Sequence, residues 1–164
     1  MDIYQLKKTT DDFRVDCERN AQYIDKIVDD LVNTYSKDLD TLMETVKTML
    51  YSDEDWTTAE FESVALKLPC LLYYVATYQE KVGIRADLSK LLNAEKYNRV
   101  YQKTQGSIPD RKIAADLETQ AEAMITSATN HAYKILQGKV QVAFEMLNSV
   151  KKILNARTNE KTPN

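Results

Sequence analysis

Two tyrosines and five basic residues in the second half of the sequence have the types and spacing that nucleic-acid binding requires. Tyr97 and Tyr101 lie four residues apart within KYNRVYQK, so on a helix they share one face. The basic residues around them and just across the next turn are Lys96, Arg99, Lys103, Arg111 and Lys112. Cations contact phosphates and aromatic rings stack on bases, which is how proteins bind single strands without sequence preference. The alternative is that both tyrosines pack between helices while the basic residues are merely solvated.

Residues that could support catalysis are few. His131 is the only histidine, which excludes a two-histidine metal site and an HExxH motif; we expect it on a surface or at a subunit contact. Cys17 and Cys70 lie too far apart for a CxxC site, and no histidine is near either of them in the sequence. We expect both to be small buried residues. The sequence therefore predicts a protein that is not an enzyme and that uses no cofactor or metal.

Two further kinds of catalytic site are also disfavoured. The three glycines, Gly83, Gly106 and Gly138, are too far apart to form a GxGxxG or phosphate-binding loop. Carboxylates crowd the N-terminal third of the chain, at Asp11, Asp12, Asp16, Asp29, Asp30, Asp38, Asp40, Asp53, Glu54 and Asp55. Such runs are usually solvated helix faces and caps. An enzyme with a carboxylate-bound Mg²⁺ or Mn²⁺ is the minor alternative.

The composition predicts an all-α protein. The 164 residues include only 3 glycines and 3 prolines, too few for the many tight turns of a β-sandwich or barrel. Charged residues make up 29% and hydrophobic residues 43%, and the mean hydropathy is -0.49. No apolar run approaches the roughly 18 residues of a membrane span, and MDIYQLKKTTDDF does not read as a secretory signal. We expect a soluble protein of the cytoplasm.

The net charge of -3 conceals two halves of opposite sign. Residues 1–84 contain 9 Lys and Arg against 17 Asp and Glu, a balance of -8. Residues 85–164 contain 13 against 8, a balance of +5. Opposite charges on separate segments favour either a polyanionic partner for the basic half or contact between subunits. The plainer alternative is that helix faces simply differ.

Apolar spacing of three and four residues predicts a helix over 9–51, which the Tyr35–Asp38 stretch could divide in two. SDEDW at 52–56 is a polar connection, and a short helix is expected from Thr58 to Lys67. Pro69 is expected in the first turn of a further helix, because proline has no amide hydrogen to donate. Tyr73, Tyr74 and Tyr78 of that helix are expected in the core with their hydroxyl groups at its edge.

The remainder predicts a helical hairpin. Gly83 is either a bend or a cap, after which the helix resumes to about Thr104. QGSIPD at 105–110 is the strongest turn signal in the sequence. The last helix is expected over 110–157, with an alanine-rich stripe that lets the preceding helix pack antiparallel against it. Within it, Gly138 is either a weak point or a place of close contact.

The predicted organisation is an acidic N-terminal helical portion over 1–68, a helical hairpin with a basic stripe over 69–157, and a frayed tail over 158–164. The expected fold is a long, coiled-coil-like antiparallel hairpin with the N-terminal helices beside it. A second basic group borders the far end of the last helix and consists of Lys139, Lys151, Lys152 and Arg157.

Five segments occur in a fixed order between residues 68 and 157: LPCLLYY, GIRAD, KYNRVYQK, GSIPDR and SVKKILNAR. This ordered set resembles a group of small helical proteins of tailed phages related to UvsY-type recombination mediators. The match covers more than half of the chain. The sequence departs from the short T-even mediators by its acidic extension of about 65 residues, and its pI near 5.3 is low for a protein that binds nucleic acid.

The resemblance implies a non-catalytic recombination mediator that binds single-stranded DNA, forms a homo-oligomer and takes part in DNA repair. Such a protein helps to load a RecA-like recombinase onto strands covered by a single-strand binding protein. It has no cofactor. The basic motif of the family does not align residue by residue here, so the expected DNA-binding residues come from the local chemistry: Lys96, Tyr97, Arg99, Tyr101, Lys103, Arg111 and Lys112.

The alternative function is a structural or scaffolding coiled-coil protein of phage assembly that does not bind DNA. In that case the acidic and basic halves pair between subunits, and the second basic group meets the acidic half of a neighbour.

Overall fold

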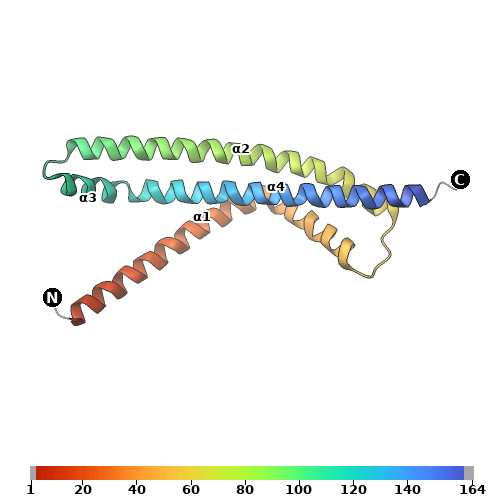
Figure 1. Ribbon diagram of the computed structural model, residues 1–164, viewed down its shortest axis with the longest axis horizontal. Helices are drawn as coiled ribbons and strands as arrows, with labels where there is room; N and C mark the ends of the chain where they lie inside the picture. The colour runs from red at the N-terminus through yellow and green to blue at the C-terminus, as the bar shows by residue number, and fades with distance from the viewer. Residues whose placement is uncertain (1–2, 161–164) are drawn as a thin grey trace. The chain divides into compact units, whose positions relative to one another are not determined.

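The computed structural model describes the backbone of residues 3–160 and the side chains of Val15 and residues 18–159. Four helices and no strands occur in this range, so the predicted all-α fold is confirmed. They are α1 (Ile3–Tyr51), α2 (Thr58–Lys103), α3 (Ile108–Glu118) and α4 (Gln120–Glu160) (Figure 1). The polar connection expected at 52–56 separates α1 from α2.

Helix α1 continues through the stretch where a break was possible. Ser36 is fully buried, and its hydroxyl donates to Oδ2 of Asp40, one turn later, at 2.8 Å. Because the side chain of Ser36 bonds within the helix rather than competing for its backbone, the polar stretch does not end α1.

The expected division of α2 into separate helices is wrong. Pro69 does not begin a new helix, because it lies inside α2 on an exposed turn. A proline removes one backbone hydrogen bond from a helix, and at an exposed position water can satisfy the freed carbonyl. Of the two alternatives for Gly83, a bend or a cap, the cap is excluded, because α2 runs past it to Lys103. The segments predicted over 58–67, 69–82 and 84–104 are therefore one helix.

The turn predicted at 105–110 is confirmed. Gly106 has φ +128°, a value that side-chain-bearing residues rarely adopt. Ser107 caps α3: its hydroxyl accepts from the backbone N–H of Asp110 at 3.4 Å, and its own N–H donates to the Asp110 carboxylate at 3.1 Å. These hydrogen bonds from Ser107 lower the pKa of Asp110. Glycine and the reciprocal cap together reverse the chain within four residues.

The last helix was expected to be continuous over 110–157. It is instead interrupted at Thr119. The backbone there has φ -104° and ψ 6°, which separates α3 from α4. The N–H and the hydroxyl of buried Thr119 both donate to the carbonyl of Ala115, at 3.1 and 2.8 Å. A threonine hydroxyl that bonds back in this way commonly disturbs a helix. Beyond the break, α4 extends to Glu160, so the first residues of the predicted frayed tail are helical, and 161–164 lie outside the described residues.

The chain forms two compact units, each assembled from separate segments. Unit 1 contains residues 1–31 and 83–132, and unit 2 contains residues 32–82 and 133–164. These units differ from the division into 1–68 and 69–157 drawn from charge and helix pattern, which stays a prediction about the sequence.

Unit 2 has a conventional apolar core between parts of α1, α2 and α4. Its fully buried side chains include Leu39, Val46, Leu68, Val75, Leu136 and Val150. Tyr35 of α1 stacks on Tyr78 of α2 with ring centroids 4.5 Å apart. Arg157 of α4 donates to the carbonyl of Trp56 at 2.6 Å and lies over the ring of Phe61. Core packing and these peripheral contacts therefore join all three helices.

Unit 1 is a thinner assembly in which α3 and the start of α4 fold back along α2. Arg111 Nε donates to the carbonyl of Tyr101 at 2.9 Å, and Lys96 Nζ reaches Glu122 at 2.6 Å. Contact positions fall along α2 as they rise along α3 and α4, so within this unit the hairpin is antiparallel (Figure 1). Most of its buried apolar side chains are small: Val28, Ala86, Ala115, Ala128 and Ala132. Helices joined through alanines approach closely and leave larger side chains outside.

Several expectations about burial are corrected. Cys70 is exposed, not buried, while the side chain of Cys17 lies outside the described residues. Tyr73 is 78% exposed and is not in the core. Tyr74 is 46% exposed, and only Tyr78 of the three is half-buried against another helix. These side chains follow Pro69 on α2, where the apolar face seen in the sequence is wider than the surface that unit 2 covers.

The surroundings of Gly138 decide between the two alternatives for this residue, a weak point in the helix and a place of close contact. It is exposed in α4, and a methyl group added there would meet nothing within 4 Å among the described residues. Gly138→Ala should therefore raise the free energy of unfolding by about 1 kcal/mol, measured by urea denaturation. Gly106→Ala is the matched control, because at φ +128° the same change should lower it by about 1 kcal/mol or more. A loss of stability in Gly138→Ala would contradict the open environment of this glycine.

Candidate nucleic-acid interface

Tyr97 and Tyr101 lie near the C-terminal end of α2, in unit 1. Their rings are nearly parallel, with an interplanar angle of 9° and centroids 6.4 Å apart, and both side chains are half-buried. The guanidinium of Arg111 lies 4.2 Å over the ring of Tyr101. One face of Tyr101 is therefore covered by a cation from α3. Of this pair of tyrosines, Tyr97 has no such cation over its ring within the described part of the chain.

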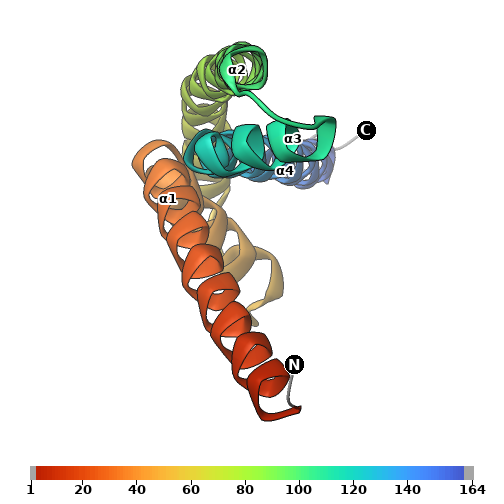
Figure 2. The same ribbon diagram turned by 90° about the vertical axis from the view of Figure 1, so that its left-hand side faces the viewer.

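Arg111 joins the two sides of the turn. It combines the ring contact with its hydrogen bond to the backbone carbonyl of Tyr101. The turn at 104–107 brings α3 back toward the end of α2, and Figure 2 shows this end of the hairpin facing the viewer. Arg111 is thus primarily a link between α2 and α3, although its charge still contributes to the local potential.

Lys96 forms ion pairs with two acidic residues, Glu122 and Glu118. Its Nζ lies 2.6 Å from Oε1 of Glu122 and 3.9 Å from Oε1 of Glu118, and its side chain is only 36% exposed. The hydrogen bond from Lys96 holds the pKa of Glu122 below its usual value. A groove of about 350 Å³ beside the pair is lined by Lys96 and by both glutamates. Because acidic groups outnumber the cation there, this groove does not suit a phosphate.

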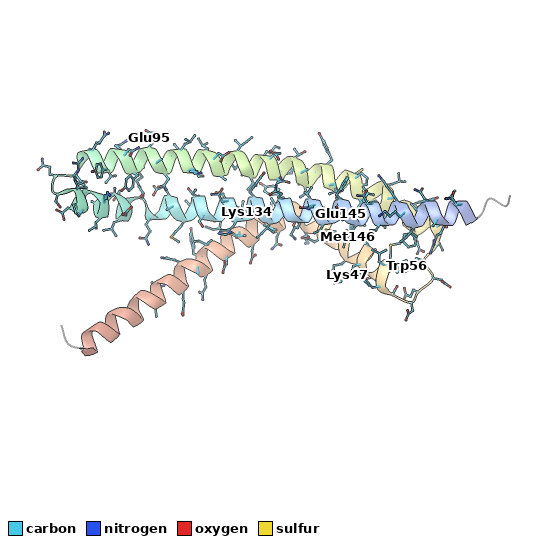
Figure 3. All side chains as sticks on the ribbon, viewed as in Figure 1. Lys47, Trp56, Glu95, Lys134, Glu145 and Met146 are labelled. Atoms are coloured by element: carbon cyan, nitrogen blue, oxygen red, sulfur yellow. The ribbon has the colours of Figure 1, made fainter. Side chains whose placement is uncertain are left out.

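Arg99 also has a partner, but a more exchangeable one. Its guanidinium bonds Glu95, one turn earlier on α2, at 2.6 Å. Both side chains are more than 60% exposed, and such surface pairs are worth only about 0.3–0.5 kcal/mol. Figure 3 labels Glu95 on the outer side of α2. A phosphate could therefore compete with Glu95 for Arg99 at small cost.

Lys103 and Lys112 are the available cations of the set. Both are exposed, and neither forms an ion pair with an acidic side chain in the described part of the chain. Lys103 occupies the last turn of α2 and Lys112 the first half of α3, so they lie on either side of the turn. The seven expected residues thus divide into an internally paired group (Lys96, Arg111, Tyr101) and an accessible group (Tyr97, Arg99, Lys103, Lys112).

The acidic partners of the basic residues were not part of the expected site. Glu95 could have been found from the sequence, because it precedes Arg99 by four residues on a helix. Glu122 follows Lys96 by 26 residues, so its role depends on the register of the hairpin. Two members of the second basic group also have partners: Lys139 pairs with Asp40, and Arg157 donates to the carbonyl of Trp56 and lies over the ring of Phe61. Lys151 and Lys152 are exposed.

The described residues contain no group of three or more His, Cys, Asp or Glu side chains placed to hold a metal ion. His131 is exposed on α4. No helix within 3–160 is both long and apolar enough to cross a membrane.

Comparison of the chain with models of protein families, with characterised proteins and with solved structures gives no match. The resemblance to recombination mediators therefore stays a hypothesis that rests on the sequence segments alone.

The lowered pKa of Glu122 predicts a specific dependence of stability on pH. A carboxyl with a pKa lower in the folded than in the unfolded state stabilises the fold above its unfolded pKa, near 4.5. That contribution disappears as the pH falls through the folded value. Thermal melts should therefore show the wild type more stable than Glu122→Gln at pH 7, with the difference shrinking below about pH 4.

Glu145→Gln is the matched control, because Glu145 is an exposed glutamate of the same helix whose carboxylate has no described partner (Figure 3). It should follow the wild type at every pH. Equal melting temperatures of Glu122→Gln and wild type at pH 7 would mean that the Lys96 pair contributes nothing to the hairpin.

Proposed function

We propose that the chain is a non-catalytic single-stranded DNA-binding protein of the recombination-mediator kind, which uses the end of the hairpin at the α2–α3 turn. The observation that carries the proposal is the parallel pair of half-buried rings, Tyr97 and Tyr101, between exposed cations. Stacking of a base on an aromatic side chain is worth about 1–3 kcal/mol, and cations beside the ring add phosphate contacts.

The contacts within unit 1 narrow the expected binding set. Tyr97, Arg99, Lys103 and Lys112 are proposed to contact DNA. Lys96, Arg111 and Tyr101 are proposed to position them, because their cations and one ring face already have partners. Four contact residues on one chain make a weak site, so an oligomer that repeats the site would bind a long strand more tightly.

The role in recombination extends this proposal. A weak, sequence-tolerant site is suited to a mediator, which must share a strand with a single-strand binding protein and with a RecA-like recombinase and then release it. The resemblance of residues 68–157 supports this role. A strand-exchange reaction with a RecA-like recombinase and saturating single-strand binding protein would show it as a shorter lag when the chain is added.

Removing the two available cations tests the phosphate contacts. Lys103→Ala/Lys112→Ala should weaken binding to a labelled oligonucleotide in fluorescence anisotropy at low salt. The plot of log affinity against log salt should also become less steep, by about 0.7 for each lysine that contacts a phosphate. Lys37→Ala/Lys67→Ala is the control with the same change in net charge, since both lysines are exposed in unit 2. Equal losses in the two double variants would mean that only net charge matters.

Tyr97 tests stacking separately from charge. Tyr97→Leu keeps an apolar side chain against the helix but removes the ring, so affinity should fall about five- to 150-fold. Tyr97→Phe keeps the ring and should bind within about twofold of the wild type. If the leucine variant binds like the wild type, with unchanged circular dichroism, base stacking does not occur at this position.

The second candidate function is a structural protein that assembles through its helices and does not bind DNA. It is supported by the contacts that Lys96 and Arg111 make within the chain, to Glu122 and to the carbonyl of Tyr101. It is also supported by the many large apolar side chains that are exposed on unit 1. An oligomer that does not bind single-stranded DNA at either about 50 or about 200 mM salt would favour this function.

A further inference from the structure

Three cations of unit 1 lie along one side of α2. Arg99 follows Lys96 by three residues, and Lys103 follows it by seven. At about 100° per residue, Arg99 projects about 60° and Lys103 about 20° to the same side of Lys96. Arg99 and Lys103 are exposed, whereas Lys96 is half-buried where this side of α2 meets α4. We call these three residues the cation row, and Lys96 is its member next to the hairpin seam.

The cation row is long enough to meet more than one phosphate. Seven residues of helix, from Lys96 to Lys103, span about 10 Å along the axis, with Arg99 between them. A strand in the B form carries one phosphate per roughly 3.4 Å of axis. By position alone, Lys96 would therefore be a third phosphate contact beside Arg99 and Lys103.

Two carboxylates of the returning helices hold Lys96 instead. Its Nζ lies 2.6 Å from Oε1 of Glu122 and 3.9 Å from Oε1 of Glu118. Glu122 stands in the first turn of α4, where the helix dipole favours a negative charge. Its other oxygen, Oε2, is buried and has no hydrogen-bond partner among the described residues. A phosphate could therefore recruit Lys96 only by leaving a partly buried carboxylate without its cation.

We infer that Glu118 and Glu122 keep Lys96 from contacting the strand, and thereby limit how tightly this end of the hairpin binds single-stranded DNA. The inference rests on the function proposed above and adds to it two residues that lower the affinity. Their negative charge also repels phosphates that approach the cation row from the seam. The strand meets Arg99 and Lys103, while the fold keeps the third cation of the row.

A purely structural ion pair would behave differently. If the two glutamates only joined the helices, their replacement would loosen the hairpin and leave DNA binding unchanged or weaker. If they also keep Lys96 from the strand, the same replacement lowers the stability of the fold and raises the affinity for DNA. Opposite effects on folding and on binding are therefore the signature of the inferred role.

Replacing both carboxylates tests the inference. At about 50 mM salt, Glu118→Gln/Glu122→Gln should bind a labelled oligothymidylate about three- to tenfold more tightly than the wild type in fluorescence anisotropy. The plot of log affinity against log salt should become steeper by about 0.7, the effect of one further phosphate contact. Adding Lys96→Gln to this variant should return the slope to that of the wild type, because the gained contact is then removed.

Asp87→Asn/Glu145→Gln is the control with the same change in net charge. Asp87 is exposed and lies nine residues before Lys96, so it projects from the opposite side of α2. Glu145 is exposed on α4 and belongs to unit 2. This variant should keep the slope of the wild type. Circular dichroism checks that every variant is folded at the temperature of the titration.

The outcomes separate the inference from the proposed function. A wild type that binds DNA, together with a glutamine variant of the same slope, overturns the inference and leaves the proposed function in place. A steeper slope that the control shares, or that persists when Lys96 is also replaced, overturns the inference as well. If neither the wild type nor the glutamine variant binds the oligonucleotide, the inference and the proposed function are both wrong.

Discussion

The reversal of the chain at Gly106 is the constraint on which the structure of unit 1 depends. Its positive φ turns the backbone, and the reciprocal bonds of Ser107 and Asp110 fix where α3 begins. That starting point sets the register in which α3 and α4 return along α2, and hence which residues Lys96 and Tyr101 meet. Moving the cap by one residue would rotate α3 by about 100° and separate Arg111 from the ring that it covers. The candidate interface is therefore a consequence of one turn.

The two units solve the packing of helices differently. Unit 2 buries leucines and valines and gains most from the removal of apolar surface from water. Unit 1 buries mainly alanines, which give close helix contact but little apolar area per residue, and its larger aliphatic side chains face outward. Polar contacts such as the Lys96–Glu122 pair consequently contribute a larger share of the stability of the hairpin in unit 1. A unit with a thin core and an apolar exterior gains stability by associating, because association covers what folding left exposed.

The all-α class, the turn at 105–110 and the antiparallel return could be predicted because composition, glycine position and capping residues act locally. The continuity of α2 through Pro69 could not, since it depends on the exposure of that turn in the folded protein. The break at Thr119 was missed for a related reason: a threonine bonds back to a carbonyl or remains a helical residue according to its surroundings. In the candidate site, the spacing of Tyr97 and Tyr101 was visible, but the pairing of Lys96 with Glu122 required the register of the hairpin.

The use of a cation in folding limits its use in binding. Lys96 bonds a glutamate whose pKa is lowered by that bond, so a phosphate would have to displace a carboxylate held at the hairpin seam. Arg99 pairs only on the surface, where the exchange of carboxylate for phosphate is nearly balanced in water. Lys103 and Lys112 have no carboxylate partner to give up within the described part of the chain, so their binding to a phosphate displaces only counterions. In a chain with a net charge of -3, these few unpaired cations on either side of one turn, rather than the overall charge, decide whether a polyanion is attracted.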